Sequence, residues 1–345
     1  RPGRQRPPAA RAVAGVAARG RGTLPPRSLS WSRLIWRPNP RMSRLWRPGQ
    51  CFAAGLNTLA IERESVLRCA VQNSPRTFAL SAFFAASFTT AASADTLSFQ
   101  DPKGDDDGWG TAEYPTGKDY ARGSFDLTGL EIKEDGDFVV FEVELAEAVA
   151  DPWKSTEWGG NGFSLQFVQI YLDTDGKARS GERKGVPGSG VEFAPDAYWE
   201  KVILVSPQPP AKLRGEVGMK AKYLDKKVIV PERTEVRGKK IIARVKKSDV
   251  GAPAKTWGVQ ALMLSNEGFS DKDEIFARKT NELPGEHRFG GGCDEVGDPQ
   301  VLDLLAGSAK GDASEKEAQH KMLSGWKCAA TMAQATPAKV GVVRR

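Results

Sequence analysis

The feature that most restricts how this chain can fold is a series of short apolar–polar alternations separated by glycine, proline and aspartate. The clearest is Phe138–Leu145, with the sequence FVVFEVEL, in which every second residue is apolar and two glutamates fall between them. Such a period of two gives a strand one face for a protein core and one face for water. Repeated short strands joined by turn-rich loops predict an all-β, antiparallel sandwich.

Other segments extend this pattern. Residues 163–172 are apolar on one register and then on the other, which predicts a β-bulge between Phe167 and Val168. Helical character is confined to the end of the chain, where 301–306 could form one turn and 313–323 a short amphipathic helix. The remaining predicted strands are 123–132, 199–206, 228–231, 240–245 and 257–265.

Charge divides the chain in two. The formal net charge is +7, but residues 1–94 hold fifteen arginines, no lysine and two acids, whereas residues 95–345 are mildly acidic. The basic character therefore belongs to the N-terminal part, and the acidic remainder gives no electrostatic reason to bind nucleic acid.

The first 94 residues do not have the pattern of a folded domain. Residues 1–65 are rich in Arg, Pro, Ala and Gly without periodicity, which predicts a disordered or mis-called extension. An Arg-rich arm that binds polyanions is the alternative. Residues 66–94 resemble a signal peptide, with an apolar stretch at 77–90 and an A-x-A cleavage site ending at Ala94. A buried helix is the alternative there. We expect a secreted or periplasmic protein without a transmembrane segment.

Two cysteines, Cys293 and Cys328, follow the predicted cleavage site. An even pair in an oxidising compartment predicts one disulfide. Metal binding by two thiols, or a catalytic cysteine, is the less favoured interpretation, because no histidine lies near either in the sequence.

Several catalytic chemistries lack their motifs. The chain has two histidines, His287 and His320, and no H-E-x-x-H, C-x-x-C, G-x-S-x-G, P-loop or G-x-G-x-x-G motif. Paired carboxylates for glycoside hydrolysis stay open, because acids are plentiful.

The acidic segment 101–110, DPKGDDDGWG, is the sharpest chemical feature. Its carboxylates would repel one another unless a cation lay between them, and oxygen-only ligands on a glycine-rich loop suit calcium. A solvated acidic loop is the alternative. Asp173 and Asp175, in the DTDG sequence that follows a predicted strand, are second-rank ligand candidates, although a simple turn explains them as well.

Three tryptophans, Trp109, Trp153 and Trp158, lie in predicted loops, where an indole face can stack on a sugar ring. Capping the ends of the sandwich is the alternative. Trp199 and Trp257 alternate with strand residues and are predicted to be core.

Four segments together carry a family resemblance: 101–132, 151–176, 190–205 and 287–306. They resemble the C-terminal domain of glucodextranase, near the family-9-like carbohydrate-binding modules and the DOMON-like domains. The resemblance covers about 95–323. It implies an immunoglobulin-like, calcium-bearing sandwich that binds a polysaccharide or cell-envelope glycan and is not catalytic. The family's metal motif matches at Asp101, Asp105 and Asp107.

These observations predict a binding domain over 95–325, followed by a flexible tail at 326–345. Because the family's modules accompany catalytic domains, a separately encoded glycoside hydrolase is an expected partner. Two other functions are weighed against binding: a glycoside hydrolase or polysaccharide-processing subunit, and a haem-binding electron-transfer domain, for which methionine and histidine are scarce.

Overall fold

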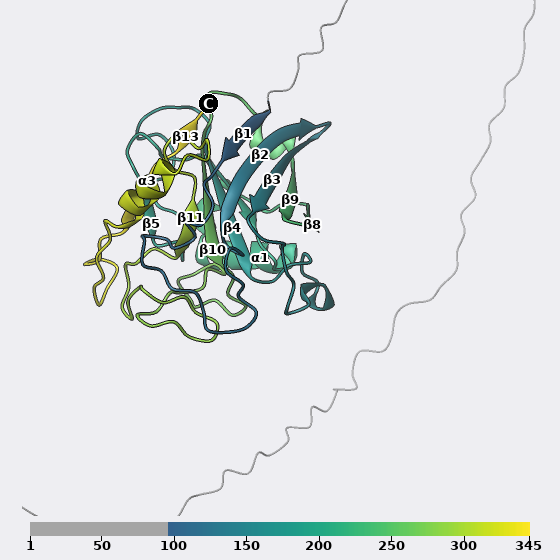
Figure 1. The fold of residues 1–345 in the computed structure, drawn as a ribbon. Coiled ribbons are helices and arrows are strands. Elements are labelled where there is room, and N and C mark those ends of the chain that lie inside the picture. The colour runs from purple at the N-terminus through teal and green to yellow at the C-terminus, as the bar shows by residue number, and fades with distance from the viewer. Residues whose placement is uncertain (1–95) are drawn as a thin grey trace, which may run out of the picture. The chain divides into compact units, whose positions relative to one another are not determined.

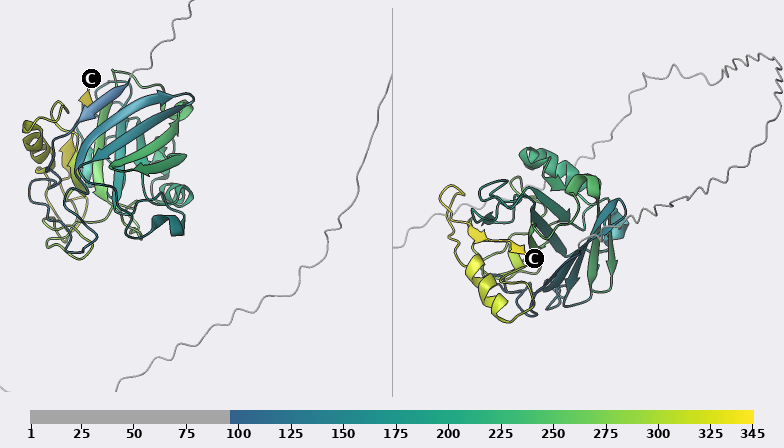
Figure 2. Two further views of the ribbon diagram at one scale, coloured as in Figure 1. Left: turned by 45° about the vertical axis from the view of Figure 1, so that its right-hand side comes forward. Right: turned by 90° about the horizontal axis from the view of Figure 1, so that it is seen from above.

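The structure is a computed structural model that describes residues 96–345. The predicted extension at 1–65 and the predicted signal peptide at 66–94 lie outside the described residues. Within 96–345 two antiparallel sheets pack face to face, with helices at their margins (Figures 1 and 2). This confirms the predicted β-sandwich with a short helix near its C-terminus.

The first sheet has five strands in the order β1-β2-β3-β9-β8, and every pairing in it is antiparallel. Its β2–β3 hairpin turns through Gly136, whose φ of 61° favours glycine at the first position of a two-residue turn. Its strands are β1 (Leu97–Gln100), β2 (Leu127–Asp135), β3 (Phe138–Leu145), β8 (Arg233–Arg237) and β9 (Lys240–Lys246).

The second sheet has the order β11-β10-β4-β6-β7, and β13 also pairs with β10. Only its β6–β7 pair is parallel. The strands are β4 (Gln166–Asp173), β6 (Lys201–Val205), β7 (Val228–Ile229), β10 (Gly258–Ser265), β11 (Val301–Leu304) and β13 (Val343–Arg344).

The core lies between the two sheets and continues past β4 on its other side. All eight residues of β4 are buried. On one face Tyr171 packs against Phe193 and Trp199, while Ile170 belongs to the same buried cluster from the opposite face. A central strand covered on both faces is apolar on both registers.

Two sequence predictions are wrong for this reason. The register of β4 against β10 is continuous through Phe167 and Val168, so the predicted bulge is absent. The predicted helical turn at 301–306 is instead the strand β11, because a short apolar run has no periodicity that separates a buried strand from a helix.

The helices are short. Helix α3 (Ser314–Leu323) confirms the predicted amphipathic segment, whereas α1 (Pro210–Lys220) was not predicted. Two glycines weaken the helical pattern of α1, but Pro210 in its first turn and the buried pair Leu213 and Val217 are readable signals. The others are η1 (Ser155–Trp158), η2 (Lys222–Leu224) and α2 (Lys247–Val250).

The predicted flexible tail at 326–345 carries regular structure. Strand β12 (Ala338–Val340) runs parallel to β5 (Val191–Phe193), and β13 lies against the beginning of β10. Ala338 and Val340 are fully buried, so this segment contributes to the core. An Ala/Val-rich sequence has too little alternation over three residues to predict such a strand.

Candidate metal centre

A cluster of buried carboxylates lies where the acidic loop meets the edge of the sandwich. Asp101 follows β1 directly, Asp105 lies four residues on, and Asp303 is contributed by β11. One oxygen from each lies within 4.8 Å of the others, and all three side chains are buried. We call these three residues the acid cluster.

Asp101 and Asp105 are predictable from sequence because they are neighbours in the chain. Asp303 is not, because the fold brings it in from some 200 residues away. One feature of the sequence does mark Asp303, because it is the single charged residue in the apolar run VLDLLA. A charged side chain in such a run is costly to bury unless it is paired or coordinates a metal ion.

Several oxygens of these acids have no partner in the structure. Both carboxylate oxygens of Asp101 and Oδ1 of Asp105 are buried without a hydrogen bond. The neighbouring Asp126, just before β2, is also buried; its Oδ2 accepts a hydrogen bond from the Gly104 N–H at 2.7 Å, but its Oδ1 has none. Buried polar atoms are nearly always satisfied, so these unpartnered acceptors make the acid cluster the place to consider for a cation.

Burial and mutual repulsion make these carboxylates hard to ionise. The pKa of Asp101 is raised to about 9 by burial and by the charge of Asp105. The pKa of Asp105 is raised to about 7 by burial and by Asp126, whose own pKa burial raises to about 6. Burial and Asp101 raise the pKa of Asp303 well above its ordinary value. A divalent cation would remove this penalty.

The arrangement is chemically suited to a hard cation. Calcium takes carboxylate and carbonyl oxygens at about 2.3–2.6 Å, so two ligands of one ion lie at most about 5 Å apart. The spacing of the acid cluster satisfies that limit. The ligands would be Asp101, Asp105 and Asp303, with Asp126 adjacent.

Asp107, the third predicted ligand, points elsewhere. Its carboxylate lies 2.8 Å from His320 Nε2 and 3.0 Å from Lys316 Nζ, both on α3. Burial pushes the pKa of Asp107 upward, but the hydrogen bonds from His320 and Lys316 outweigh it and lower the pKa. Asp107 therefore docks the helix and is not part of the acid cluster.

Helix α3 also holds the acidic loop through Gln319, which is fully buried. Its Nε2 donates to the carbonyl oxygens of Asp105 at 2.5 Å and Gly108 at 3.3 Å, and its Oε1 accepts from the Leu304 N–H at 2.9 Å. One side chain thus fixes the loop against β11, and so fixes Asp105 relative to Asp303.

The two acids predicted as second-rank ligands, Asp173 and Asp175, have protein partners, although Oε1 of the neighbouring Glu200 is buried without a hydrogen bond. Asp173, Asp175 and Glu200 lie close enough to share an ion. However, Asp173 pairs with the Arg344 guanidinium and accepts from the Gly176 N–H, and Asp175 accepts from the Lys177 N–H and from Ser180. These contacts favour the turn interpretation.

A comparison with known protein families identifies the family to which this chain belongs. The C-terminal, SLH-like binding module of glucodextranase matches residues 96–339. The chain belongs to this family. A comparison with curated proteins finds no match. Within residues 96–345, no helix combines the length and apolar character needed to cross a bilayer.

The three tryptophans predicted to contact sugar differ in exposure within this glucodextranase-type module. Trp109 is only 9% exposed and packs edge-on against Trp326, so it offers no face to a ligand. Trp153 is half-buried against Tyr120 and His287. Trp158 is 39% exposed, and its indole N–H donates to the Trp153 carbonyl oxygen.

The other aromatic and sulfur predictions have clear places. Trp199 and Trp257 are buried, which confirms them as core. Cys293 and Cys328 are joined by a disulfide with their Cα atoms 6.7 Å apart. They are therefore not thiol ligands in this structure.

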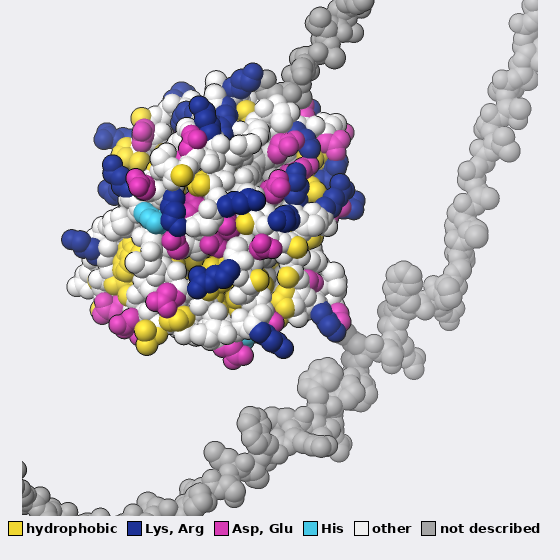
Figure 3. Space-filling model, in the orientation of Figure 1, with side chains coloured by type: hydrophobic (Ala, Val, Ile, Leu, Met, Phe, Trp, Pro, Cys, Tyr) yellow, Lys and Arg dark blue, Asp and Glu magenta, His cyan; other side chains and the backbone are white. Residues whose placement is uncertain are grey.

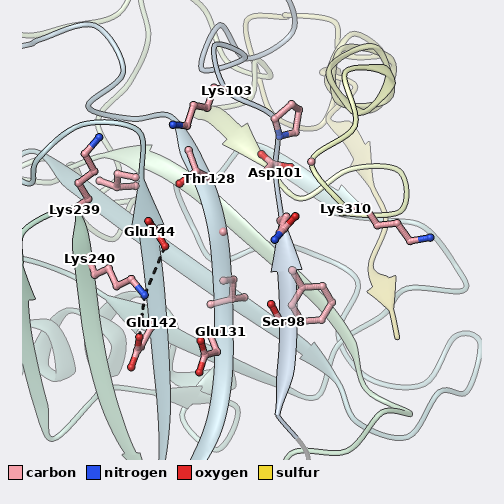
Figure 4. A pocket seen from close by; sticks show the side chains of 17 residues that line it. Ser98, Asp101, Lys103, Thr128, Glu131, Glu142, Glu144, Lys239, Lys240 and Lys310 are labelled. Carbon is pink, nitrogen blue, oxygen red and sulfur yellow. Dashed lines mark hydrogen bonds and ion pairs between the residues drawn. The ribbon is translucent and has the colours of Figure 1, made fainter.

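A shallow hollow of about 510 Å³ covers part of the outer face of the first sheet (Figure 4). Three of its charged side chains pair with one another: Lys240 lies 3.3 Å from Glu142 and 3.6 Å from Glu144. Its one aromatic lining residue, Phe99, is buried. The hollow therefore lacks a flat apolar face for a sugar.

Charges of both signs are intermingled on the face drawn in Figure 3. Residues 95–345 contain somewhat more acidic than basic residues. Neither provides the continuous basic surface that nucleic-acid binding uses.

Proposed function

We propose that this chain is an exported, non-catalytic module that binds carbohydrate and is stabilised by calcium. The observation that carries the binding is the family match to a binding module of glucodextranase over residues 96–339. The predicted signal peptide at 66–94 supports export, and a separately encoded glycoside hydrolase would be the natural partner of such a module.

The calcium part of the proposal rests on the acid cluster. Its carboxylates converge, are buried and leave oxygens unpartnered. A cation that binds only the native state stabilises it by mass action, by about 2.7 kcal/mol at one hundred times the dissociation constant. Calcium bound by Asp101, Asp105 and Asp303 would hold β1, the acidic loop and β11 together.

Carbohydrate binding is tested with the purified full chain. Affinity electrophoresis through gels containing dextran or pullulan should retard the protein, and the same polymers should not be hydrolysed. Migration unaffected by every polysaccharide tried would contradict the binding function. Release of reducing sugar would favour a glycoside hydrolase, and a Soret band would favour the haem-binding alternative.

Calcium binding is tested by thermal unfolding with calcium and with excess chelator. We expect a higher melting temperature with calcium, and loss of that difference when Asp105 and Asp303 are both changed to Asn. Asp175→Asn is the matched control, because it alters an acid of the other group. If Asp175→Asn alone abolished the difference, the ion would bind at the second group instead.

A further inference from the structure

A cleft of about 500 Å³ opens beside β5, and neither the acid cluster nor Trp158 contributes to its lining. It lies within the size range of small-ligand sites. Its walls come from the glycine-rich segment 183–192, from Tyr223 of η2, and from the segments 273–280, 295–300 and 332–337. Segments so far apart in sequence form one cleft only because the fold holds them.

The segment 270–274, which leads into the wall at 273–280, is fixed to helix α1 by a single lysine. Lys220 Nζ donates to Ser270 Oγ at 2.9 Å and to the carbonyl oxygens of Asp271 at 2.7 Å and Glu274 at 3.0 Å. Tyr223 follows this helix by three residues. These contacts fix the position of Tyr223 relative to the acidic wall beside it.

The opposite wall is fixed by the disulfide. Cys293–Cys328 joins the segment leading to 295–300 to the segment leading to 332–337. Backbone hydrogen bonds between Val296 and Ala329 continue the connection. A cleft with both walls fixed needs little ordering when a ligand binds, which lowers the cost of binding.

Glycine allows the segments that line the cleft to come close together. A Cβ on Gly190, whose φ is 70°, would lie 2.2 Å from the Asp298 carbonyl oxygen. A Cβ on Gly297, whose φ is 126°, would lie 2.7 Å from the Ala335 side chain. These contacts are possible only without a side chain at either position.

The chemistry of the lining fits a neutral, hydroxyl-rich ligand. The Tyr223 side chain is 64% exposed and offers an aromatic face. Five carboxylates and three cationic side chains line it; Arg183 pairs with Glu192 at 3.4 Å and Lys279 with Glu274 at 3.0 Å, and the others are Lys184, Asp273, Glu295 and Asp298. Mixed charges donate to and accept from hydroxyl groups, while the acidic excess disfavours polyanions.

We infer that this cleft binds a neutral oligosaccharide chain, with the Tyr223 ring stacking on one sugar. The inference rests on the proposed carbohydrate-binding function and assigns it a place. It differs from the sequence-based expectation, which placed the ligand at the loop tryptophans.

The test compares single variants of the full chain in affinity electrophoresis against dextran and pullulan. Tyr223→Ala should weaken binding about tenfold, the loss of one aromatic stacking contact, whereas Tyr223→Phe should retain it. Phe269→Ala is the matched control, because Phe269 is a more exposed aromatic outside the cleft lining. Equal melting temperatures establish that each variant is folded.

The outcomes separate the two proposals. If the unaltered chain binds and Tyr223→Ala binds equally well, the cleft is not the site, although the module still binds carbohydrate; loss of binding in Trp158→Ala would then place the sugar there. If the unaltered chain binds no polysaccharide, neutral or acidic, the cleft and the proposed function both fail. Tighter binding to polygalacturonate than to dextran would overturn the neutral ligand.

Discussion

At the scale of single residues, the acid cluster shows how far sequence reasoning reaches. Asp101 and Asp105 are recognisable because four acids occur within seven residues. Which of those acids point inward is decided by contacts with distant segments: Asp107 meets α3, whereas Asp303 arrives from β11. The exposure of the tryptophans likewise depends on distant segments, because Trp109 is buried against Trp326.

Asp101→Asn should change stability in opposite directions with and without calcium. The pKa of Asp101 is about 9 in the folded state and near 3.9 in an unfolded chain, so folding at pH 8 must place a proton on this carboxyl group, and an amide avoids that cost. In chelator near pH 8 the variant should melt a few degrees above the unaltered protein, since about 1 kcal/mol corresponds to about 2–4 °C in a domain of this size. With calcium it should melt below it. A variant destabilised equally in both conditions would show that Asp101 is not a ligand.

The pH dependence of stability should also change with calcium. The folded-state pKa values of Asp126, Asp105 and Asp101, about 6, 7 and 9, lie above the value near 3.9 of an unfolded aspartate. The folded state therefore retains protons that the unfolded state releases, and its penalty is absent below about pH 4 and complete only above the folded pKa values.

In chelator, the melting temperature should consequently fall as the pH rises from 5 to 9. Bound calcium keeps the carboxylates ionised at lower pH, so the calcium-loaded protein should show a much smaller fall. Calorimetry in both conditions measures this. Parallel curves would mean that the acid cluster does not hold the ion.

At the scale of elements, the strands with one wet face were predictable and those buried on both faces were less so. Phe138–Leu145 alternates and was placed with its correct bounds. The buried strands β4 and β11 lack this alternation. A bulge was therefore predicted in β4, and a helical turn was predicted where β11 lies. Helix α3 was predicted from its pattern, but its role as the clamp of the acidic loop depends on Gln319, whose partners lie over 200 residues earlier and on β11.

Gln319→Leu should reveal this role. The substitution keeps the side-chain volume but leaves the carbonyl oxygens of Asp105 and Gly108 without their partner, whereas the Leu304 N–H still donates to Asp303 Oδ1 at 2.8 Å. Each buried group left unsatisfied costs about 1–3 kcal/mol, so urea unfolding should show a loss of at least about 2 kcal/mol. Calcium affinity should fall as well, because the loop is less well held.

Lys321→Ala provides the comparison. Lys321 is an exposed residue of the same helix, and its replacement should alter the unfolding free energy by less than about 0.5 kcal/mol. Similar urea midpoints for the two variants would show that Gln319 contributes no more than an ordinary helix surface position.

At the scale of the whole molecule, the last residues complete the sandwich. Arg344 on β13 pairs with the buried Asp173, and Arg345 Nε donates to the Ser98 carbonyl oxygen at 2.6 Å. The described chain thus begins and ends side by side near β1 (Figure 1). Sequence alone suggested a free tail held by one disulfide; the fold shows that the pairing of β12 and β13 secures the C-terminal part of 326–345.

This arrangement decides what reduction of Cys293–Cys328 should release. In the chain-entropy model a loop of this length, 35 residues in sequence separation, is worth about 3–4 kcal/mol. Beyond Cys328, however, β12 and β13 stay paired with β5 and β10. Reduction should therefore free only the segment between Lys327 and β12, so limited trypsin digestion should cut first after Lys327 while the C-terminal fragment remains bound.

The Cys293→Ser, Cys328→Ser double variant should behave like the reduced protein, read by native mass spectrometry. Dissociation of the fragment on cleavage would show that the disulfide, and not strand pairing, holds the end of the chain; identical digestion before and after reduction would show that the bond restrains neither.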